Sequence, residues 1–239
     1  MLPVAILMGG LGTRVLPLTE TVPKAMLPIQ EEPFVAHQLR LLHKRGIERA
    51  VLCVGYLGEQ IRDYVGDGSS FGMQVDYSWD GPVAQGTAGA LRNALNKLDE
   101  AFFVIYGDSY LPCDYVAVEQ AFVSSGKQAL MTVFRNGGQW DSSNVEFDGE
   151  RIVAYDKQHR TERMCYIDYG LGIFKSTVLA NLPNQPYDLA TVYQDLLHRD
   201  ELAAMEIAER FYEAGSFEGI QSLSEFLDQE ESQQVERNV

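Results

Sequence analysis

A glycine-rich turn directly follows the first apolar run of the chain, and it constrains the fold more than any other feature. The run from Val4 to Leu7 predicts a buried strand, and three glycines lie between residues 9 and 12. Glycine lets the backbone turn sharply and come close to a ligand, so several N–H groups can point at one phosphate chain. Arg14 and Lys24 add two cations nearby. Together these features predict a site for a nucleoside triphosphate.

Two common phosphate-binding motifs do not fit this turn. A Walker loop requires a Gly-Lys-Ser/Thr ending, which the chain lacks here, and a dinucleotide fingerprint requires a third glycine where the chain has Val15. Both motifs are therefore excluded.

The stretch from Gly9 to Ile29, GGLGTRVLPLTETVPKAMLPI, closely resembles the signature of the sugar-1-phosphate nucleotidylyltransferases, or nucleotide-sugar pyrophosphorylases. The resemblance implies that a nucleoside triphosphate and a sugar 1-phosphate give a nucleotide sugar and pyrophosphate, with Mg²⁺ as cofactor. It implies catalytic roles for Arg14, which stabilises the departing pyrophosphate, and for Lys24, which neutralises charge near the α-phosphate. It also implies that nucleotide is bound by Leu7, Gly9, Gly10, Gly12 and Thr13.

The N-terminal part alternates between predicted strands and helices. The elements after the first strand are a helix from Phe34 to Gly46, a strand from Ala50 to Val54, a helix from Glu59 to Val65 and a strand from Val75 to Trp79. Such alternation indicates parallel strands joined by crossover helices. In these sheets the first strand-to-helix turn usually binds the nucleotide.

The rest of the chain predicts more strands. A helix from Gly86 to about Lys97, a strand 102–106, a helix 116–125 and a strand 129–134 are followed by strands at 144–147, 151–155 and 166–174 and a helix at 189–197. We expect an α/β fold of the Rossmann-like, GT-A-like kind, with a mixed, mainly parallel sheet flanked by helices and a smaller strand-rich sugar-binding part.

The expected organisation is one nucleotidyltransferase domain over residues 1–239. A nucleotide-binding half reaches to about residue 135, and a sugar-phosphate-binding half runs from about 136 to 221. The acidic stretch from Glu225 to Glu231 predicts a solvated terminal helix, so residues 222–239 form this helix and a polar tail.

Asp108 is the first candidate metal ligand. It follows a buried strand, and the carboxyl ends of parallel strands form the edge at which ligands bind. The alternative is a turn or helix cap, because Asp is common at caps. By resemblance, the Asp of this Gly-Asp pair holds Mg²⁺.

Three residues at the start of the helix predicted from Gly86 are candidates for nucleoside binding. By resemblance, the segment containing Gly86 and Thr87 lines the nucleoside. The amide of Gln85 has a donor and an acceptor and could read a base edge; alternatively it is an exposed loop glutamine.

Two segments resemble the family's sugar-binding segments. Tyr155-Asp156-Lys157 stands where the family has Glu-Lys, which assigns the sugar phosphate to Lys157. Asp156, Asp168 and the Gly170 backbone would then meet sugar hydroxyls. Asp156 is shorter than the usual Glu, and the alternative for Lys157 is an exposed hairpin charge.

Glu213 stands at the place of the acid that supplies the second Mg²⁺ ligand in the family. Glutamate can coordinate Mg²⁺ but is one methylene longer than the usual aspartate. This departure leaves open a weakened or non-catalytic site.

The composition excludes some partners. A formal charge of −15 argues against binding to nucleic acid or an anionic membrane. No apolar run approaches the roughly 20 residues of a membrane span, and the N-terminus lacks the features of a signal peptide, so we expect a cytoplasmic protein. The sequence leaves open whether the chain forms a homo-oligomer.

The substrate prediction rests on resemblance. The chain looks most like the guanylyltransferases for heptose 1-phosphate or mannose 1-phosphate, which feed capsule and lipopolysaccharide synthesis. A uridylyl or thymidylyl enzyme for a hexose 1-phosphate is one alternative, and a non-catalytic regulatory subunit that binds nucleotide sugar is another.

Overall fold

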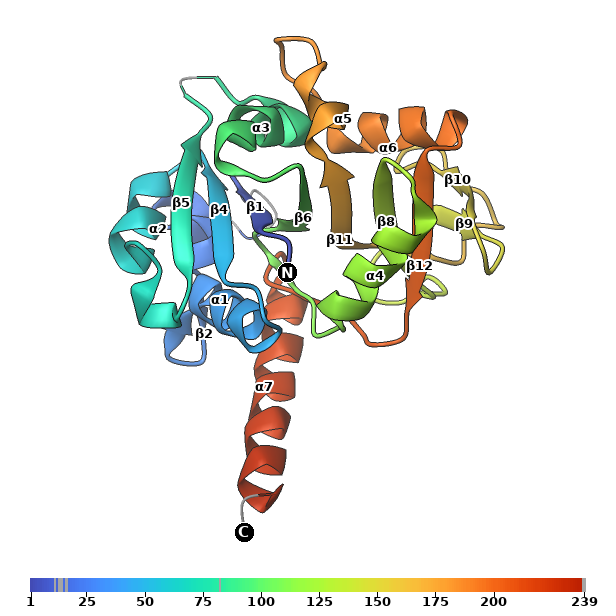
Figure 1. Cartoon of the computed structure of the whole chain (residues 1–239). Coiled ribbons are helices and arrows are strands. Elements are labelled where there is room, and N and C mark those ends of the chain that lie inside the picture. Colours follow the sequence, from blue (N-terminus) through green and yellow to red (C-terminus); the bar gives the residue numbers. More distant parts are fainter. Residues whose placement is uncertain (11, 13–14, 16, 82, 238–239) are drawn as a thin grey trace.

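A central sheet organises the molecule, whose computed structural model describes residues 1–10, 12, 15, 17–81 and 83–237 (Figure 1). Within these residues the sheet has seven strands in the order β12-β8-β11-β6-β1-β4-β5. The strands are β1 (Val4–Met8), β4 (Arg49–Val54), β5 (Gln74–Trp79), β6 (Ala101–Tyr106), β8 (Ala129–Phe134), β11 (Ile167–Lys175) and β12 (Leu202–Ile207).

One strand runs against the others, so the sheet is mixed but mainly parallel, as predicted. β6, β1, β4 and β5 are parallel, with Val4 of β1 opposite Ala50 on one side and Phe103 on the other. β11 is antiparallel to both β6 and β8, and β12 is parallel to β8. β8, which the sequence assigns to the nucleotide-binding half, therefore pairs with strands of the sugar-binding half.

Helices cover both faces of the sheet. They are α1 (Phe34–Lys44), α2 (Gly58–Val65), α3 (Gly86–Ala94), α4 (Tyr115–Ser125), α5 (Ser176–Ala180) and α6 (Leu189–His198). Strand residues alternate between the faces. Ile6 packs with Leu39 of α1 on one face, and Ala5 packs with Leu91 of α3 on the other. Burial of these two faces gives the layered α/β core.

Short elements complete the fold. Three two-stranded ribbons pair β2 (Pro28–Ile29) with β3 (Glu32–Pro33), β7 (Ser109–Tyr110) with β13 (Tyr212–Glu213), and β9 (Val145–Phe147) with β10 (Ile152–Tyr155). Short 3₁₀ helices lie at Leu18–Glu20, Lys24–Met26, Ser69–Phe71 and Leu95–Lys97.

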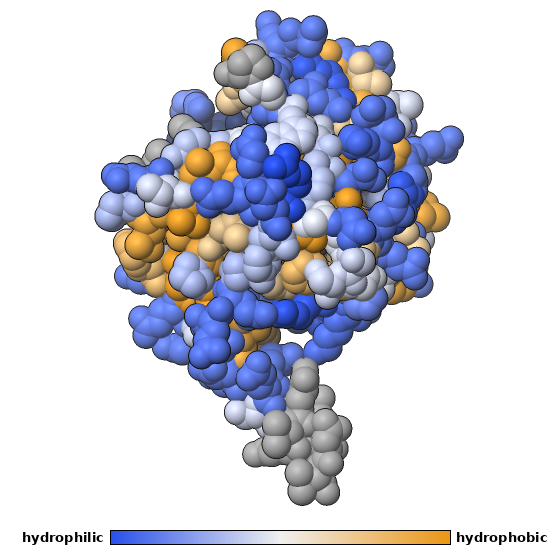
Figure 2. Space-filling view, turned by 90° about the vertical axis from the view of Figure 1, so that its left-hand side faces the viewer, coloured by the Kyte–Doolittle hydropathy of each residue, from blue (hydrophilic) through white to orange (hydrophobic). Residues whose placement is uncertain are grey.

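The terminal helix α7 (Phe217–Arg237) begins earlier than predicted and is not wholly solvated. Leu223 is fully buried, and Ile220 and Phe226 pack beside it on Tyr110. These apolar residues recur at helical spacing, so one stripe of the first half docks on the body. The second half extends away from the body (Figure 1), and its surface before the part drawn in grey is mostly hydrophilic (Figure 2). Within the described part of the chain, no helix has the length and apolar character needed to cross a bilayer.

Candidate active site

Two adjoining cavities open at the carboxyl ends of the central strands. The first has a volume of about 300 Å³ and the second about 310 Å³. Tyr106 and Asp108, at the end of β6, line both cavities. A molecule in one cavity can therefore meet a molecule in the other at Asp108.

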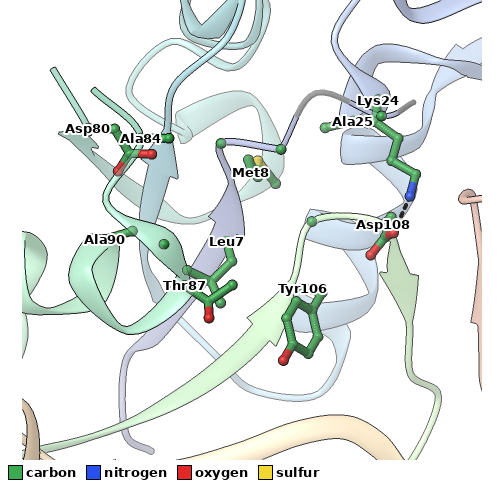
Figure 3. A pocket seen from close by; sticks show the side chains of 15 residues that line it. Leu7, Met8, Lys24, Ala25, Asp80, Ala84, Thr87, Ala90, Tyr106 and Asp108 are labelled. Atoms are coloured by element: carbon green, nitrogen blue, oxygen red, sulfur yellow. Dashed lines mark hydrogen bonds and ion pairs between the residues drawn. The ribbon is translucent and has the colours of Figure 1, made fainter. Parts of the chain in front are cut away.

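The first cavity gathers most of the residues predicted to bind nucleotide (Figure 3). Its lining includes Leu7, Gly9, Gly10, Gly12, Lys24, Gly86, Thr87 and Asp108. Thr13 and Arg14 lie outside the described residues, so their predicted roles stay predictions.

A buried hydroxyl holds the glycine-rich loop. Gly12 has a φ of +64°, a backbone conformation that favours glycine. Its carbonyl accepts hydrogen bonds from the Thr19 hydroxyl at 2.8 Å and from the Val15 N–H at 3.1 Å. Thr19 is only 1% exposed. The Gly12 carbonyl is thus held from inside the protein, and Gly12 also lines the first cavity.

Lys24 forms an ion pair with Asp108 across the first cavity (Figure 3). Pro23 precedes the short helix that carries Lys24, and Asp108 directly follows β6 and Gly107. Both side chains are mostly buried, at 16% and 20% exposure. The pair brings the predicted catalytic cation and the predicted metal ligand together in one contact.

Gln38 of α1 supports the turn that carries Asp108, a role that the sequence did not predict. Its amide nitrogen donates to the carbonyl of Tyr106 at 2.9 Å and to the carbonyl of Ser109 at 2.7 Å. Gln38 is 1% exposed. A polar residue within the apolar face of a predicted helix was the available signal, because buried amides need partners.

The ribbon of β7 and β13 brings Glu213 beside Asp108. Glu213 pairs with Ser109 in the register, and the Ala214 N–H donates to the Asp108 carbonyl at 2.8 Å. An oxygen of the Glu213 carboxylate accepts from the Ser216 hydroxyl at 2.8 Å. The two predicted metal ligands, far apart in the chain, are therefore neighbours in the fold.

A Mg²⁺ ion that arrives with a triphosphate needs few ligands from the protein. Among the described residues, no group of three or more His, Cys, Asp or Glu side chains could hold a metal ion. Mg²⁺ in phosphate-transfer sites usually takes one or two carboxylates, and substrate phosphates and water complete its octahedron. Asp108 and Glu213 are the side chains that would hold it.

The second cavity contains the predicted sugar-binding residues Lys157, Asp168 and Gly170, together with Glu213. The Asp168 carboxylate is 6% exposed and lies 4.0 Å from the Lys157 ammonium. Lys157 also lies 5.5 Å from the centre of the Tyr106 ring, a cation–π distance. A cation and a carboxylate are therefore available next to Asp108.

Asp156 and Gln85 are not among the residues that line these two cavities, and their predicted roles in binding stay predictions. One Asp156 oxygen accepts from the N–H groups of Gln158 at 2.7 Å and His159 at 2.9 Å, and these bonds lower the pKa of Asp156. Gln85 donates its amide to the Val83 carbonyl at 2.8 Å. Each side chain satisfies its own turn, a preference of short polar side chains that competes with ligand binding.

Asp80 lines the first cavity at the end away from Lys24 and Asp108, and the sequence did not single it out (Figure 3). Its carboxylate lies so close to Gly9 that a Cβ there would be 2.7 Å from Oδ2. Burial raises the pKa of Asp80 above its usual value. Asp80 follows β5 as Asp108 follows β6, so the same rule about strand ends would have found it.

A mainly parallel sheet with glycines and a cation–carboxylate pair at its carboxyl edge is typical of nucleotide-binding α/β proteins. Residues 4–229 match the family model described as "Nucleotidyl transferase". The chain belongs to the nucleotidyl transferase family.

Relatives with different substrates resemble the chain. It is 31% identical over 201 residues to the Synechocystis sp. UTP–glucose-1-phosphate uridylyltransferase. The matched region covers 77% of this chain and 52% of the relative. It is 30% identical over 181 residues to mannose-1-phosphate guanylyltransferase of Mycobacterium tuberculosis, covering 74% of this chain and 50% of the relative. The chain thus spans about half the length of these curated relatives.

A solved structure has the same fold. HddC from Yersinia pseudotuberculosis, in complex with GMP-PN, superposes with a TM-score of 0.80 at 23% identity, covering 95% of this chain and 100% of that chain. At this identity the likeness establishes the GT-A-like architecture predicted from the sequence.

Proposed function

We propose that the chain is a sugar-1-phosphate nucleotidylyltransferase that converts a nucleoside triphosphate and a sugar 1-phosphate to a nucleotide sugar and pyrophosphate. The observation that carries this proposal is the position of Asp108, which is shared by two cavities and contacts Lys24. One cavity contains the glycine-rich loop, and the other contains Lys157. The reacting phosphates would meet between them.

The reaction needs no general base. The attacking oxygen of a sugar 1-phosphate is already anionic at neutral pH. It attacks the α-phosphorus, a new P–O bond forms, and the bond from the α-phosphorus to the bridging oxygen breaks to release pyrophosphate. The main obstacle is repulsion between two anions, so positioning and neutralisation of charge supply the catalysis.

Each group has a part in this neutralisation. Backbone N–H groups of the loop from Gly10 to Thr13 cradle the triphosphate. Lys24 neutralises charge at the α-phosphate, and Arg14 does so at the departing pyrophosphate. Asp108 and Glu213 would hold Mg²⁺, which would supply further positive charge when bound. Lys157 binds the phosphate of the sugar.

Asp80 supports GTP as the nucleotide. The pairing edge of guanine presents two adjacent donors, N1–H and the 2-amino group, whereas uracil and thymine present one N–H between two carbonyl oxygens. An ionised carboxylate only accepts hydrogen bonds. Asp80 lies at the end of the first cavity opposite the reacting end, where a base would extend (Figure 3). A carboxylate there pairs with guanine and repels the carbonyls of uracil and thymine.

The sugar is proposed as mannose or heptose 1-phosphate, because the Mycobacterium relative is a mannose-1-phosphate guanylyltransferase and the signature resembles those of both enzymes. The alternative is an enzyme that uses UTP and a hexose 1-phosphate, because the Synechocystis relative is a UTP–glucose-1-phosphate uridylyltransferase. A cytoplasmic location and a role in capsule or lipopolysaccharide synthesis remain predictions.

The test is Mg²⁺-dependent release of pyrophosphate with four nucleoside triphosphates and a panel of sugar 1-phosphates. We expect release with GTP that disappears without Mg²⁺ and falls greatly in Lys24→Ala. Asp80→Asn should lower the ratio of kcat/KM for GTP to kcat/KM for UTP by about tenfold or more. One good pair of hydrogen bonds to a base discriminates against the wrong base by roughly 1–3 kcal/mol. Turnover with UTP alone would overturn the guanine assignment but keep the reaction.

A regulatory subunit that binds nucleotide sugar is the second candidate. The observation that favours it is Glu213, which is longer than the acid at the corresponding place in the resembled family. Tight binding of a nucleotide sugar to the folded protein, with no pyrophosphate from any pair, would favour this candidate over the enzyme.

A further inference from the structure

Asp168 of the second cavity has both carboxylate oxygens engaged by the protein. One oxygen accepts from the Gly170 N–H at 3.1 Å, and the other accepts from the Tyr155 hydroxyl at 3.3 Å. The Asp168 side chain is 6% exposed, and Tyr155 is 4% exposed. Two donors, one on each oxygen, therefore restrain the orientation of this carboxylate at the wall of the cavity.

Tyr155 is itself firmly held at the end of β10. Its carbonyl accepts from the amide of Gln194 on α6 at 3.1 Å, and its ring packs edge-on against Tyr193 with 6.0 Å between centroids. The Lys157 ammonium lies 6.0 Å from the centre of the Tyr155 ring. One residue thus contacts both the cation and the carboxylate of the second cavity.

Asn144 ties the same two segments together. Its side-chain oxygen accepts from the Asp168 N–H at 3.0 Å, and its carbonyl accepts from the Asp156 N–H at 3.0 Å. Asn144 therefore holds the backbone of Asp168 close to the backbone that follows Tyr155. This arrangement allows the Tyr155 hydroxyl to reach the Asp168 carboxylate.

We propose that Tyr155 is a positioning residue for the sugar 1-phosphate: it acts through Asp168, whose orientation toward the sugar hydroxyls it fixes, and through Lys157. This inference rests on the proposed function. The Asp156 side chain binds its own turn, so the contact with sugar hydroxyls falls to Asp168. Each carboxylate oxygen can accept more than one hydrogen bond, so the bonds from Tyr155 and Gly170 leave acceptor capacity for the substrate.

Tyr155→Phe tests the proposal because it removes only the hydroxyl. We expect KM for the sugar 1-phosphate that supports turnover to rise about tenfold, as for the loss of a hydrogen bond to a charged group. The kcat at saturation and the KM for the nucleotide should change less than about twofold, because the lost interaction acts on substrate binding alone. A purely structural tyrosine would instead lower the unfolding midpoint and leave this KM unchanged.

Two further variants sharpen the test. Tyr115→Phe removes a buried hydroxyl on α4 from a residue that lines neither cavity, and should leave the KM for the sugar 1-phosphate unchanged. Asp168→Glu moves the carboxylate while keeping Tyr155, and should raise the same KM. If Tyr155→Phe does not fold, Asp168→Glu decides: an unchanged KM then overturns the proposal.

The two proposals can fail separately. If the wild type releases pyrophosphate and Tyr155→Phe has an unchanged KM for the sugar, only the positioning role is wrong. If the wild type releases no pyrophosphate, calorimetry compares the binding of mannose 1-phosphate and glucose 1-phosphate to the wild type and to Tyr155→Phe. Equal binding overturns the positioning role, weaker binding to the variant supports it, and no binding to the wild type overturns both proposals.

Discussion

The ionised carboxylate of Asp80 favours the proposed selectivity for GTP but lowers the stability of the folded protein. Its carboxylate lies against Gly9 in a partly buried position, and burial raises its pKa above the usual value for an aspartate. The ionised form is therefore less favourable in the folded protein than in the unfolded chain. A carboxylate kept at this cost is expected where it has a ligand to bind.

The pH dependence of stability follows from this shift. Between the unfolded pKa and the raised folded pKa, the folded state binds more protons, so stability falls as the pH rises through this window. Asp80→Asn removes the ionisation and should raise the free energy of unfolding at about pH 7, with a smaller gain at about pH 4. Urea denaturation at both pH values measures it. Asp200→Asn, whose side chain is 89% exposed, is the control, and an equal gain in both variants would contradict the role of burial.

Single residues also differ in how well the sequence predicts their contacts. Lys24 and Asp108 were predictable because each stands at a fixed place in a motif or after a strand. The roles of Asp156 and Gln85 were harder to predict, because a polar side chain in a turn can bind either a ligand or the nearby backbone. The sequence does not decide between the two, and in the structure both side chains form hydrogen bonds with the nearby backbone.

At the scale of elements, continuous apolar runs made the parallel strands easy to predict. β12, with the sequence LAAMEI, was missed because it lies at an edge of the sheet, has small residues and is only partly buried. The ribbon of β7 and β13 was also missed, since two residues in each strand are too few for a pattern. That ribbon sets the position of Glu213, so resemblance could name this residue but could not place it.

The contact between α1 and the end of β6 yields a prediction at this scale. Gln38→Met leaves the carbonyls of Tyr106 and Ser109 without the donor that Gln38 supplies, and should lower the free energy of unfolding by roughly 1–3 kcal/mol. Urea denaturation measures the loss. Gln60→Met is the matched control, because the Gln60 amide donates to the Thr21 carbonyl at an exposed site. A Gln38→Met protein as stable as the control variant would contradict the supporting role.

At the scale of the whole molecule, the two halves share one sheet. β11 lies between β6 and β8, so each of these strands depends on a segment distant in sequence. β8 pairs only with β11 and β12 among the described strands. A boundary near residue 135 therefore separates roles in binding more than it separates independently folding units.

A fragment of residues 1–135 tests this dependence. The fragment leaves the outer edge of β6 unpaired and removes both partners of β8. We expect it to lack a cooperative unfolding transition and to aggregate through the bare edge. Circular dichroism during urea titration and light scattering, with the full chain at equal concentration as reference, measure both properties. A sharp transition in a monomeric fragment would show that the N-terminal half folds alone.

The pairing of β7 with β13 has a consequence for how the protein is made. A ribosome releases the chain from its N-terminus, so the glycine-rich loop, Lys24 and Asp108 are all synthesised well before Glu213. The carboxylate pair can form only when β13 has left the ribosome and docked on β7. Incomplete chains that lack β13 therefore cannot assemble the proposed metal site, and under the proposed function the nascent protein stays inert until Glu213 has been synthesised and β13 has docked.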